Sequence, residues 1–145
     1  VLWLGWISVW QISVFEIILL AWKIAGEGMR VIAKAAVTQA MQKYSQWHAA
    51  LSLWLTTFDK PGLRFESFEQ TRRHWSTTSG WNVDRVPHSK LRETSRKGPL
   101  DIYIFDIKKN ECRIICWINT MNGTIYIKDI LPHAGYDKWC KSEVK

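Results

Sequence analysis

The 145-residue chain lacks the short motifs that mark common enzyme chemistries. It contains no G-x-S-x-G sequence, no Walker-type phosphate loop and no H-E-x-x-H sequence. Its three cysteines, Cys112, Cys116 and Cys140, include no C-x-x-C pair, so neither a zinc site nor a disulfide framework is predicted. We therefore expect no metal and no cofactor, and unpaired thiols favour a reducing, cytoplasmic setting.

Charged side chains are scarce in residues 1–28, in contrast to the rest of the chain. Only Glu16, Lys23 and Glu27 are charged there, which gives this segment a net charge of −1. The whole chain has a net charge of +7, so residues 29–145 carry +8. Such an excess on a small domain is typical of proteins that bind nucleic acid or another polyanion, although a basic protein without such a ligand has the same composition.

The apolar, tryptophan-rich residues 1–25 are long enough to cross a bilayer, which takes about 20 residues. Against this, Glu16 lies inside the stretch, where an unpaired carboxylate costs roughly 2.5–3.5 kcal/mol. No basic segment precedes the apolar run and it contains no A-x-A-like cleavage site, so a secretory signal peptide is not predicted. A membrane segment is one interpretation of residues 1–28.

The sequence Gly26-Glu27-Gly28, directly before Met29, permits a second interpretation. Back-translated, it can contain the purine-rich GGAG of a bacterial ribosome-binding site a few nucleotides before ATG. Residues 1–28 would then be an upstream extension of the reading frame rather than functional protein. A Gly26 codon other than GGA would contradict this hypothesis. On either interpretation we divide the chain into a leader, 1–28, and a domain, 29–145.

The first part of this domain predicts a short strand followed by helical structure. The sequence MRVIAK from Met29 alternates apolar and basic residues, as a strand does. Residues 35–60 predict helix, with a possible break near Ser45. Apolar residues recur there at three- and four-residue spacing, in one stripe of Ala36, Ala40, Met41 and Tyr44 and a second of Trp47, Leu51, Trp54 and Leu55. Pro61-Gly62 follows and ends the helical pattern.

Residues 63–98 show no firm pattern beyond a helix-compatible stretch near 65–75. Much of the positive charge lies here, on Arg64, Arg72, Arg73, Arg85, Lys90, Arg92, Arg96 and Lys97. A long segment without clear structure is often a functional or mobile loop.

Residues 100–131 contain three runs of β-branched and aromatic residues, LDIYIFDI, CRIICWI and TIYIKDIL. The short gaps between them, with Asn122-Gly123 in the second, predict an antiparallel meander with tight hairpins. Because both faces of these strands are largely apolar, helices must cover at least one. The elements predict an α+β domain, a small antiparallel sheet with the N-terminal helices packed on one face.

The strand alternation assigns side chains to the two faces of this sheet. Arg113, Ile115 and Trp117 share one face of the second strand, opposite the face of Cys112 and Cys116. On the third strand we expect Tyr126, Lys128 and Ile130 to share a face, opposite Ile127, Asp129 and Leu131.

Two segments beside these strands have polar groups suited to phosphate chemistry. The hairpin KKNECR presents Lys108 and Lys109 next to Arg113, which we expect to point outward and, with them, to bind a phosphate. A solvated turn is at least as common an explanation for such a sequence. After the last strand, at the end of a sheet where acid–base groups are frequent, lie His133, Tyr136, Asp137 and Lys138. Taken singly, each is more often a surface polar residue.

From Met29 onward the chain resembles the HigB-type toxins, members of the RelE superfamily of mRNA interferases from type II toxin–antitoxin modules. MRVIAKAA is similar to that family's opening residues, and FDIKKNECRII to its F-I-x-x-N-x-[YF]-R-L hairpin. YIKDILPHAGYDKW is similar to its YI-[RK]-x-x-x-T-H-x-E-Y-D-K ending. The resemblance extends to about Lys141. Two positions depart from the pattern, because Pro132 replaces the usual Thr and Gly135 the usual Glu.

The resemblance implies a RelE/HigB-like fold and ribosome-dependent, metal-independent cleavage of mRNA, in which the RNA 2′-OH attacks the adjacent phosphate. The expected catalytic residues are Arg113 and Lys128 on the phosphate, His133 for proton transfer, Tyr136 for stacking or proton transfer, and Asp137 for orientation. The expected RNA-binding residues are Lys108, Lys109, Asn110, Lys138, Arg92 and Lys97. The implied partners are a HigA-type, helix-turn-helix antitoxin and mRNA on the ribosome.

Two other functions are compatible with the sequence. The first is a membrane-tethered, non-enzymatic basic domain that binds RNA or anionic lipid through residues 64–97, which requires that residues 1–28 are translated. The second is a degenerate member of the toxin family that binds antitoxin and no longer cuts RNA, as the departures at Pro132 and Gly135 permit.

Overall fold

The computed structural model describes residues 29–93, 95 and 98–145, so the predicted leader, 1–28, lies outside the described residues. The strands are β1 Arg30–Ile32, β2 Val83–Val86, β3 Ile102–Ile107, β4 Cys112–Asn119 and β5 Thr124–Pro132. The α-helices are α2 Lys34–Lys43, α3 His48–Phe58, α4 Phe68–Ser79 and α5 His133–Glu143, with 3-10 turns η1 Ser45–Trp47 and η2 His88–Lys90. No helix in this part of the chain is long and apolar enough to span a membrane.

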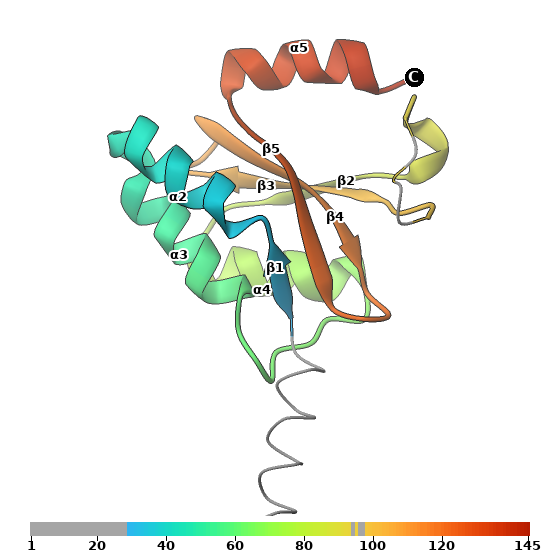
Figure 1. Cartoon of the computed structure of the whole chain (residues 1–145), viewed down its shortest axis with the longest axis horizontal. Helices are drawn as coiled ribbons and strands as arrows, with labels where there is room; N and C mark the ends of the chain where they lie inside the picture. The colour runs from blue at the N-terminus through green and yellow to red at the C-terminus, as the bar shows by residue number, and fades with distance from the viewer. Residues whose placement is uncertain (1–28, 94, 96–97) are drawn as a thin grey trace, which may run out of the picture.

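The strands form one five-stranded sheet in the order β1-β5-β4-β3-β2 (Figure 1). The predicted meander is confirmed, because β3, β4 and β5 pair antiparallel through two short turns. β1 lies parallel to β5 at one edge, and β2 pairs antiparallel with β3 at the other. The sequence analysis did not predict β2, whose polar Asp84 and Arg85 obscure the strand pattern.

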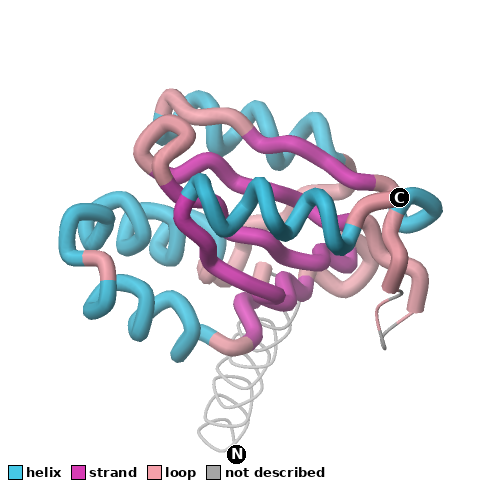
Figure 2. Tube along the Cα trace, turned by 90° about the horizontal axis from the view of Figure 1, so that it is seen from above, coloured by secondary structure: helices cyan, strands magenta, loops and turns pink. Residues whose placement is uncertain are grey.

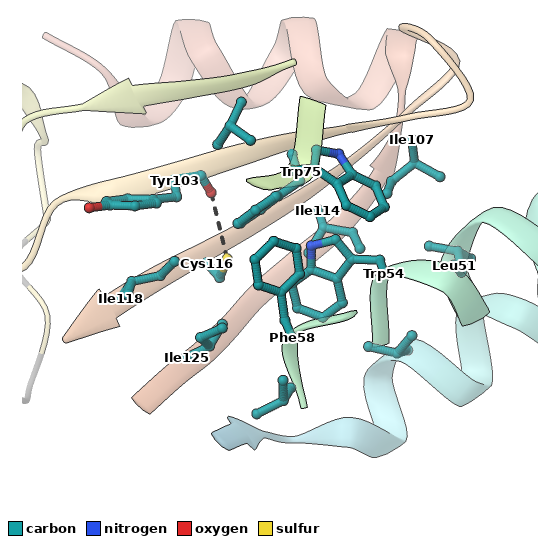
Figure 3. Packing of buried hydrophobic residues seen from close by; sticks show 14 of the residues in the cluster. Leu51, Trp54, Phe58, Trp75, Tyr103, Ile107, Ile114, Cys116, Ile118 and Ile125 are labelled. Carbon is teal, nitrogen blue, oxygen red and sulfur yellow. Dashed lines mark hydrogen bonds between the residues drawn. The ribbon is translucent and has the colours of Figure 1, made fainter. Parts of the chain in front are cut away.

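The N-terminal helices pack on one face of the sheet, as predicted (Figure 1). The predicted break near Ser45 is also confirmed, because η1 separates α2 from α3. This layer has an aromatic core in which Trp54 and Phe58 of α3 meet Trp75 of α4 (Figure 3). Both residues of α3 also contact Phe105 of β3. Burial of an apolar side chain contributes about 1.5–3 kcal/mol, so this layer provides most of the hydrophobic stabilisation.

Helix α4 forms in the segment for which the sequence gave only a weak helical pattern. The Ser67 hydroxyl accepts a hydrogen bond from the Gln70 backbone, and the Gln70 side chain accepts one from the Glu66 backbone. Such reciprocal capping satisfies backbone donors that the first helical turn leaves free. Gly80 ends the helix with φ of 82°, a left-handed conformation that glycine adopts without strain.

Helix α5 covers the opposite face of the sheet, which the sequence analysis left uncovered (Figures 1 and 2). Its buried Trp139 packs against Ile102 and Ile104 of β3 and Ile115 of β4. The sheet therefore lies between two helical layers, a large aromatic one and a small one formed by α5.

Strand β5 contains an irregularity that corrects one prediction. Ile127 pairs with Cys116 and Asp129 with Ile115, so Lys128 is an extra residue without a partner on β4, as in a β-bulge. Beyond it the alternation is reversed. Ile130 packs with the N-terminal helices and Leu131 lies under α5, so the prediction that Ile130 shares a face with Tyr126 is wrong.

Candidate active site on the α5 face of the sheet

Arg113 is the central cation of the α5 face, and it is buried rather than outward as predicted. It is 8% exposed and lies directly opposite Asp106 in the β3–β4 register. Its Nε atom is 3.0 Å from Asp106 Oδ1, and the Asp106 side chain is 17% exposed. The two atoms are close enough for an ion pair, yet neither makes a hydrogen bond of normal geometry. The pair is therefore held by charge attraction, which solvent screens weakly in this layer.

Tyr136 of α5 covers the Arg113 guanidinium. The guanidinium carbon lies 5.0 Å from the centre of the Tyr136 ring, a cation–π arrangement. The same ring stacks on Trp139, with centroids 6.1 Å apart and planes at 13°. Burial, with a smaller effect of the Cys140 thiol, raises the pKa of Tyr136 far above its ordinary value. The phenol is therefore neutral at physiological pH, and it can stack or donate a hydrogen bond but does not act as a base.

His133 and Asp137 lie at the N-terminal end of α5, one helical turn apart. His133 Nε2 is 3.5 Å from Asp137 Oδ2, and both side chains are more than half exposed. The His133 backbone N–H donates to the carbonyl of Glu111, at 3.0 Å, in the β3–β4 turn. This bond places an accessible imidazole beside the hairpin that leads to Arg113.

The β3–β4 turn presents the predicted RNA-binding residues Lys108, Lys109 and Asn110 to solvent. Lys108 and Lys109 have positive φ values of 51° and 62°, the left-handed conformation found in tight hairpin turns. Because the turn is bonded to the start of α5, the structure brings together Arg113, Tyr136, His133 and these two lysines at one end of the sheet.

Lys128 lies on the same face but away from this group. The bulge lies about three residues before Leu131, the partner of Arg113, which corresponds to roughly 10 Å along the strand. The Lys128 side chain is 18% exposed, and its Nζ atom lies 4.7 Å from the centre of the Trp117 ring and 3.8 Å from Glu93 Oε2. Lys128 thus lies on the α5 face without joining the group around His133.

Of the other predicted RNA-binding residues, Arg92 lies away from this group. The Arg92 backbone bonds to the carbonyl of Glu143, at the far end of an 11-residue helix from His133. At a rise of 1.5 Å per residue, His133 and Glu143 are about 15 Å apart along the helix. Lys138 is exposed on α5, and Lys97 lies outside the described residues.

Asp106, Glu93 and Trp117 contact the predicted site residues but were not themselves predicted to be in the site. For Asp106 the sequence contained a signal. A four-residue turn, 108–111, places Asp106 opposite Arg113, and opposite charges at such positions attract. Within the described ranges, no group of three or more His, Cys, Asp or Glu side chains is arranged to hold a metal ion.

The model of one protein family, HigB_toxin, matches residues 89–139, and the family is described as the RelE-like toxic component of a toxin–antitoxin system. The matched range contains β3, β4, β5, the hairpin turn and the first two turns of α5, which carry the candidate site. No curated protein gives a significant match to the chain.

Proposed function

We propose that this chain, whose residues 89–139 match the model of the RelE-like HigB toxins, is a toxin of a toxin–antitoxin system that cleaves mRNA on the ribosome. The family implies an antitoxin partner, for which we propose a HigA-type helix-turn-helix protein. One observation supports the proposal most. Arg113, Tyr136 and His133 come from a strand and a helix, and they meet beside a lysine-bearing turn at one end of the sheet.

The proposed reaction is attack of an RNA 2′-OH on the adjacent phosphorus, with departure of the 5′ oxygen of the next nucleotide. The products are a 2′,3′-cyclic phosphate and a 5′-hydroxyl, and the net proton transfer is from the 2′-OH to the leaving oxygen. His133 transfers a proton in this step, because its side chain is accessible and histidine is the commonest proton-transfer residue in general acid–base catalysis. Asp137 orients the imidazole from the next helical turn.

The charge that develops on the phosphate is stabilised by Arg113. A guanidinium offers paired donors that match phosphate oxygens. Direct contact requires the Tyr136 ring to turn aside, because that ring covers the cation. Once displaced, the ring is available to stack on a base, which is worth about 1–3 kcal/mol in proteins that bind single-stranded nucleic acid.

The remaining cations bind the RNA backbone in this proposal. Lys108, Lys109 and Asn110 contact phosphates next to the cleaved one, and Lys128 contacts a phosphate further along the strand. These contacts are electrostatic, so cleavage weakens as salt concentration rises. No metal ion takes part in the proposed reaction.

Inducible expression of residues 29–145 in bacteria, with and without the antitoxin from the adjacent gene, tests the function. We expect growth arrest that the antitoxin relieves and mRNA cuts that require translation, mapped by primer extension. His133→Ala and Arg113→Ala should each lower cleavage about 100-fold or more, in the range of lost general acid–base catalysis. Matched controls are His48→Ala and Arg73→Ala, which change exposed residues of α3 and α4. Full toxicity of both site variants, with correct folding, would refute the site.

A second candidate function is a degenerate toxin that binds antitoxin without cutting RNA. Pro132 occupies the N-cap of α5 and gives it no side-chain hydrogen bond, and Gly135 has no side chain where the family has Glu. A Cβ at Gly135 would meet its nearest neighbour, Leu131, at 3.5 Å, so a side chain fits there. If wild type is inactive, restored cleavage in Pro132→Thr with Gly135→Glu would support this alternative.

We propose that the functional domain begins at Met29 and acts in the cytoplasm. Met29 is 3% exposed, and its N–H donates to the carbonyl of Leu63 at 2.7 Å, so it is an integral part of the core. Mass spectrometry of the product expressed from its own upstream DNA tests this boundary. A stable membrane-associated product that contains residues 1–28 would instead favour the membrane-tethered alternative.

A further inference from the structure

The backbone of Asp106 is held by hydrogen bonds from two sides. Its backbone N–H donates to the carbonyl of Asn82 at 2.9 Å, beside β2. Its carbonyl accepts a hydrogen bond of 3.0 Å from the indole Nε1 of Trp75, a fully buried residue on the other side of the sheet. Asp106 is therefore anchored from both the sheet edge and the aromatic core.

Within the described residues, the Asp106 carboxylate forms an ion pair with one cation, Arg113. The Nε side of the guanidinium faces this carboxylate, its Cζ faces the Tyr136 ring, and Nη1 is 3.5 Å from the Cys112 carbonyl. Asp106 thus determines which edge of the guanidinium is left for another anion, namely the edge of the terminal nitrogens.

We propose that Asp106 is a positioning residue for RNA cleavage, which holds Arg113 beneath Tyr136 and offsets its charge until an RNA phosphate arrives. This inference rests on the proposed function. It predicts two opposite effects when the carboxylate is removed. The guanidinium, no longer compensated, attracts RNA phosphates more strongly, and its orientation is lost, so the chemical step slows.

The test is single-turnover cleavage of a 5′-labelled mRNA on programmed ribosomes, with toxin in excess over a range of concentrations. The maximal rate and the half-saturating toxin concentration are measured for wild type, Asp106→Asn, Asp106→Ala and Asp106→Glu. Asp101→Asn is the control for net charge, because Asp101 lies just before the opposite end of β3 and pairs with His88. Circular dichroism verifies that each variant is folded.

We expect Asp106→Asn and Asp106→Ala to lower the maximal rate at least tenfold and to lower the half-saturating concentration at least threefold. Asp106→Glu should recover part of the rate, and Asp101→Asn should stay within threefold of wild type. A structural defect would reduce the active fraction without tightening binding, so a lower rate with unchanged half-saturation overturns the inference. A maximal rate within twofold of wild type also overturns it. Wild type that cuts no mRNA refutes the proposed function itself, and this inference with it.

Discussion

Two fully buried tryptophans offer a matched test of the aromatic core. Trp54 and Trp75 are both 0% exposed and both contact Phe58 and Phe105. They differ in their indole N–H, because that of Trp75 donates to Asp106 whereas that of Trp54 has no hydrogen-bond partner in the described structure. The same substitution, Trp→Phe, removes similar volume at each site, so the packing loss largely cancels in the comparison.

The hydrogen bond then decides the difference in unfolding free energy. Trp75→Phe loses a bond worth about 1 kcal/mol, whereas Trp54→Phe removes an unsatisfied donor whose burial costs about 1–3 kcal/mol. We therefore expect Trp75→Phe to be about 2–4 kcal/mol more destabilising than Trp54→Phe. Urea unfolding followed by far-ultraviolet circular dichroism measures both, with equal m-values as the control for two-state behaviour. Equal destabilisation by the two substitutions would refute this reasoning.

Three further predictions concern single positions. Burial raises the pKa of Cys112 to about 12 and that of Cys116 well above its ordinary value. Iodoacetamide at pH 8 should therefore modify the partly exposed Cys140 first, and the two buried cysteines only on unfolding. Peptide mass spectrometry measures the order of modification. Burial also raises the pKa of Asp106, with Asp84 adding to the effect and Arg113 opposing it, so the native state binds this proton more tightly than the unfolded chain. Ionisation of Asp106 therefore lowers the unfolding free energy of wild type as pH rises above 3.8. In urea titrations over that pH range, Asp106→Asn should become progressively more stable relative to wild type. A difference in unfolding free energy that does not change with pH would contradict this prediction. Gly80→Ala should cost about 1–2 kcal/mol in thermal unfolding, because a Cβ meets nothing within 4 Å and only the left-handed backbone opposes it.

The fold could be predicted where local sequence rules agreed with the tertiary structure. The runs around Ile104, Ile115 and Ile127 are β-branched and separated by short turns, so the meander follows from them. Helix α5 was missed because Gly135 and the preceding Pro132 weaken its helical pattern. The spacing of Tyr136, Trp139 and Cys140 by three and four residues could have indicated it.

The residues of the candidate site were proposed from the sequence by resemblance, whereas their geometry could not be predicted. The hairpin and the C-terminal motif gave Arg113, His133 and Tyr136 by resemblance, and the structure places them at one end of the sheet, although it tests no catalytic role. The burial of Arg113 depends on α5, which had not been predicted. The position of Lys128 depends on a bulge, and a bulge is defined by pairing between strands rather than by the residues of one strand.

The α5 layer contains most of the unsatisfied polar atoms in the described structure. Four of the six buried side-chain polar atoms without a hydrogen-bond partner are Asp106 Oδ1, Arg113 Nε, Trp117 Nε1 and Trp139 Nε1. Asp106 Oδ1 and Arg113 Nε lie 3.0 Å apart and compensate each other by charge, whereas each unpaired indole N–H costs about 1–3 kcal/mol, so this layer is not optimised for stability. Clusters of unsatisfied groups are expected at functional sites, where a ligand provides the missing partners.

Replacement of the ion pair by apolar residues separates stability from function in this layer. Asp106→Leu combined with Arg113→Met removes both charges at similar volume, and such replacements of buried pairs are often neutral or stabilising by about 1–4 kcal/mol. We therefore expect the double variant to unfold at an equal or higher urea concentration than wild type and to lose growth arrest. Arg113→Met alone should be destabilised, because it leaves the Asp106 carboxylate buried without its cation. A double variant that keeps full growth arrest would contradict the proposed role of Arg113 in cleavage, and one clearly less stable than wild type would contradict the expected stability.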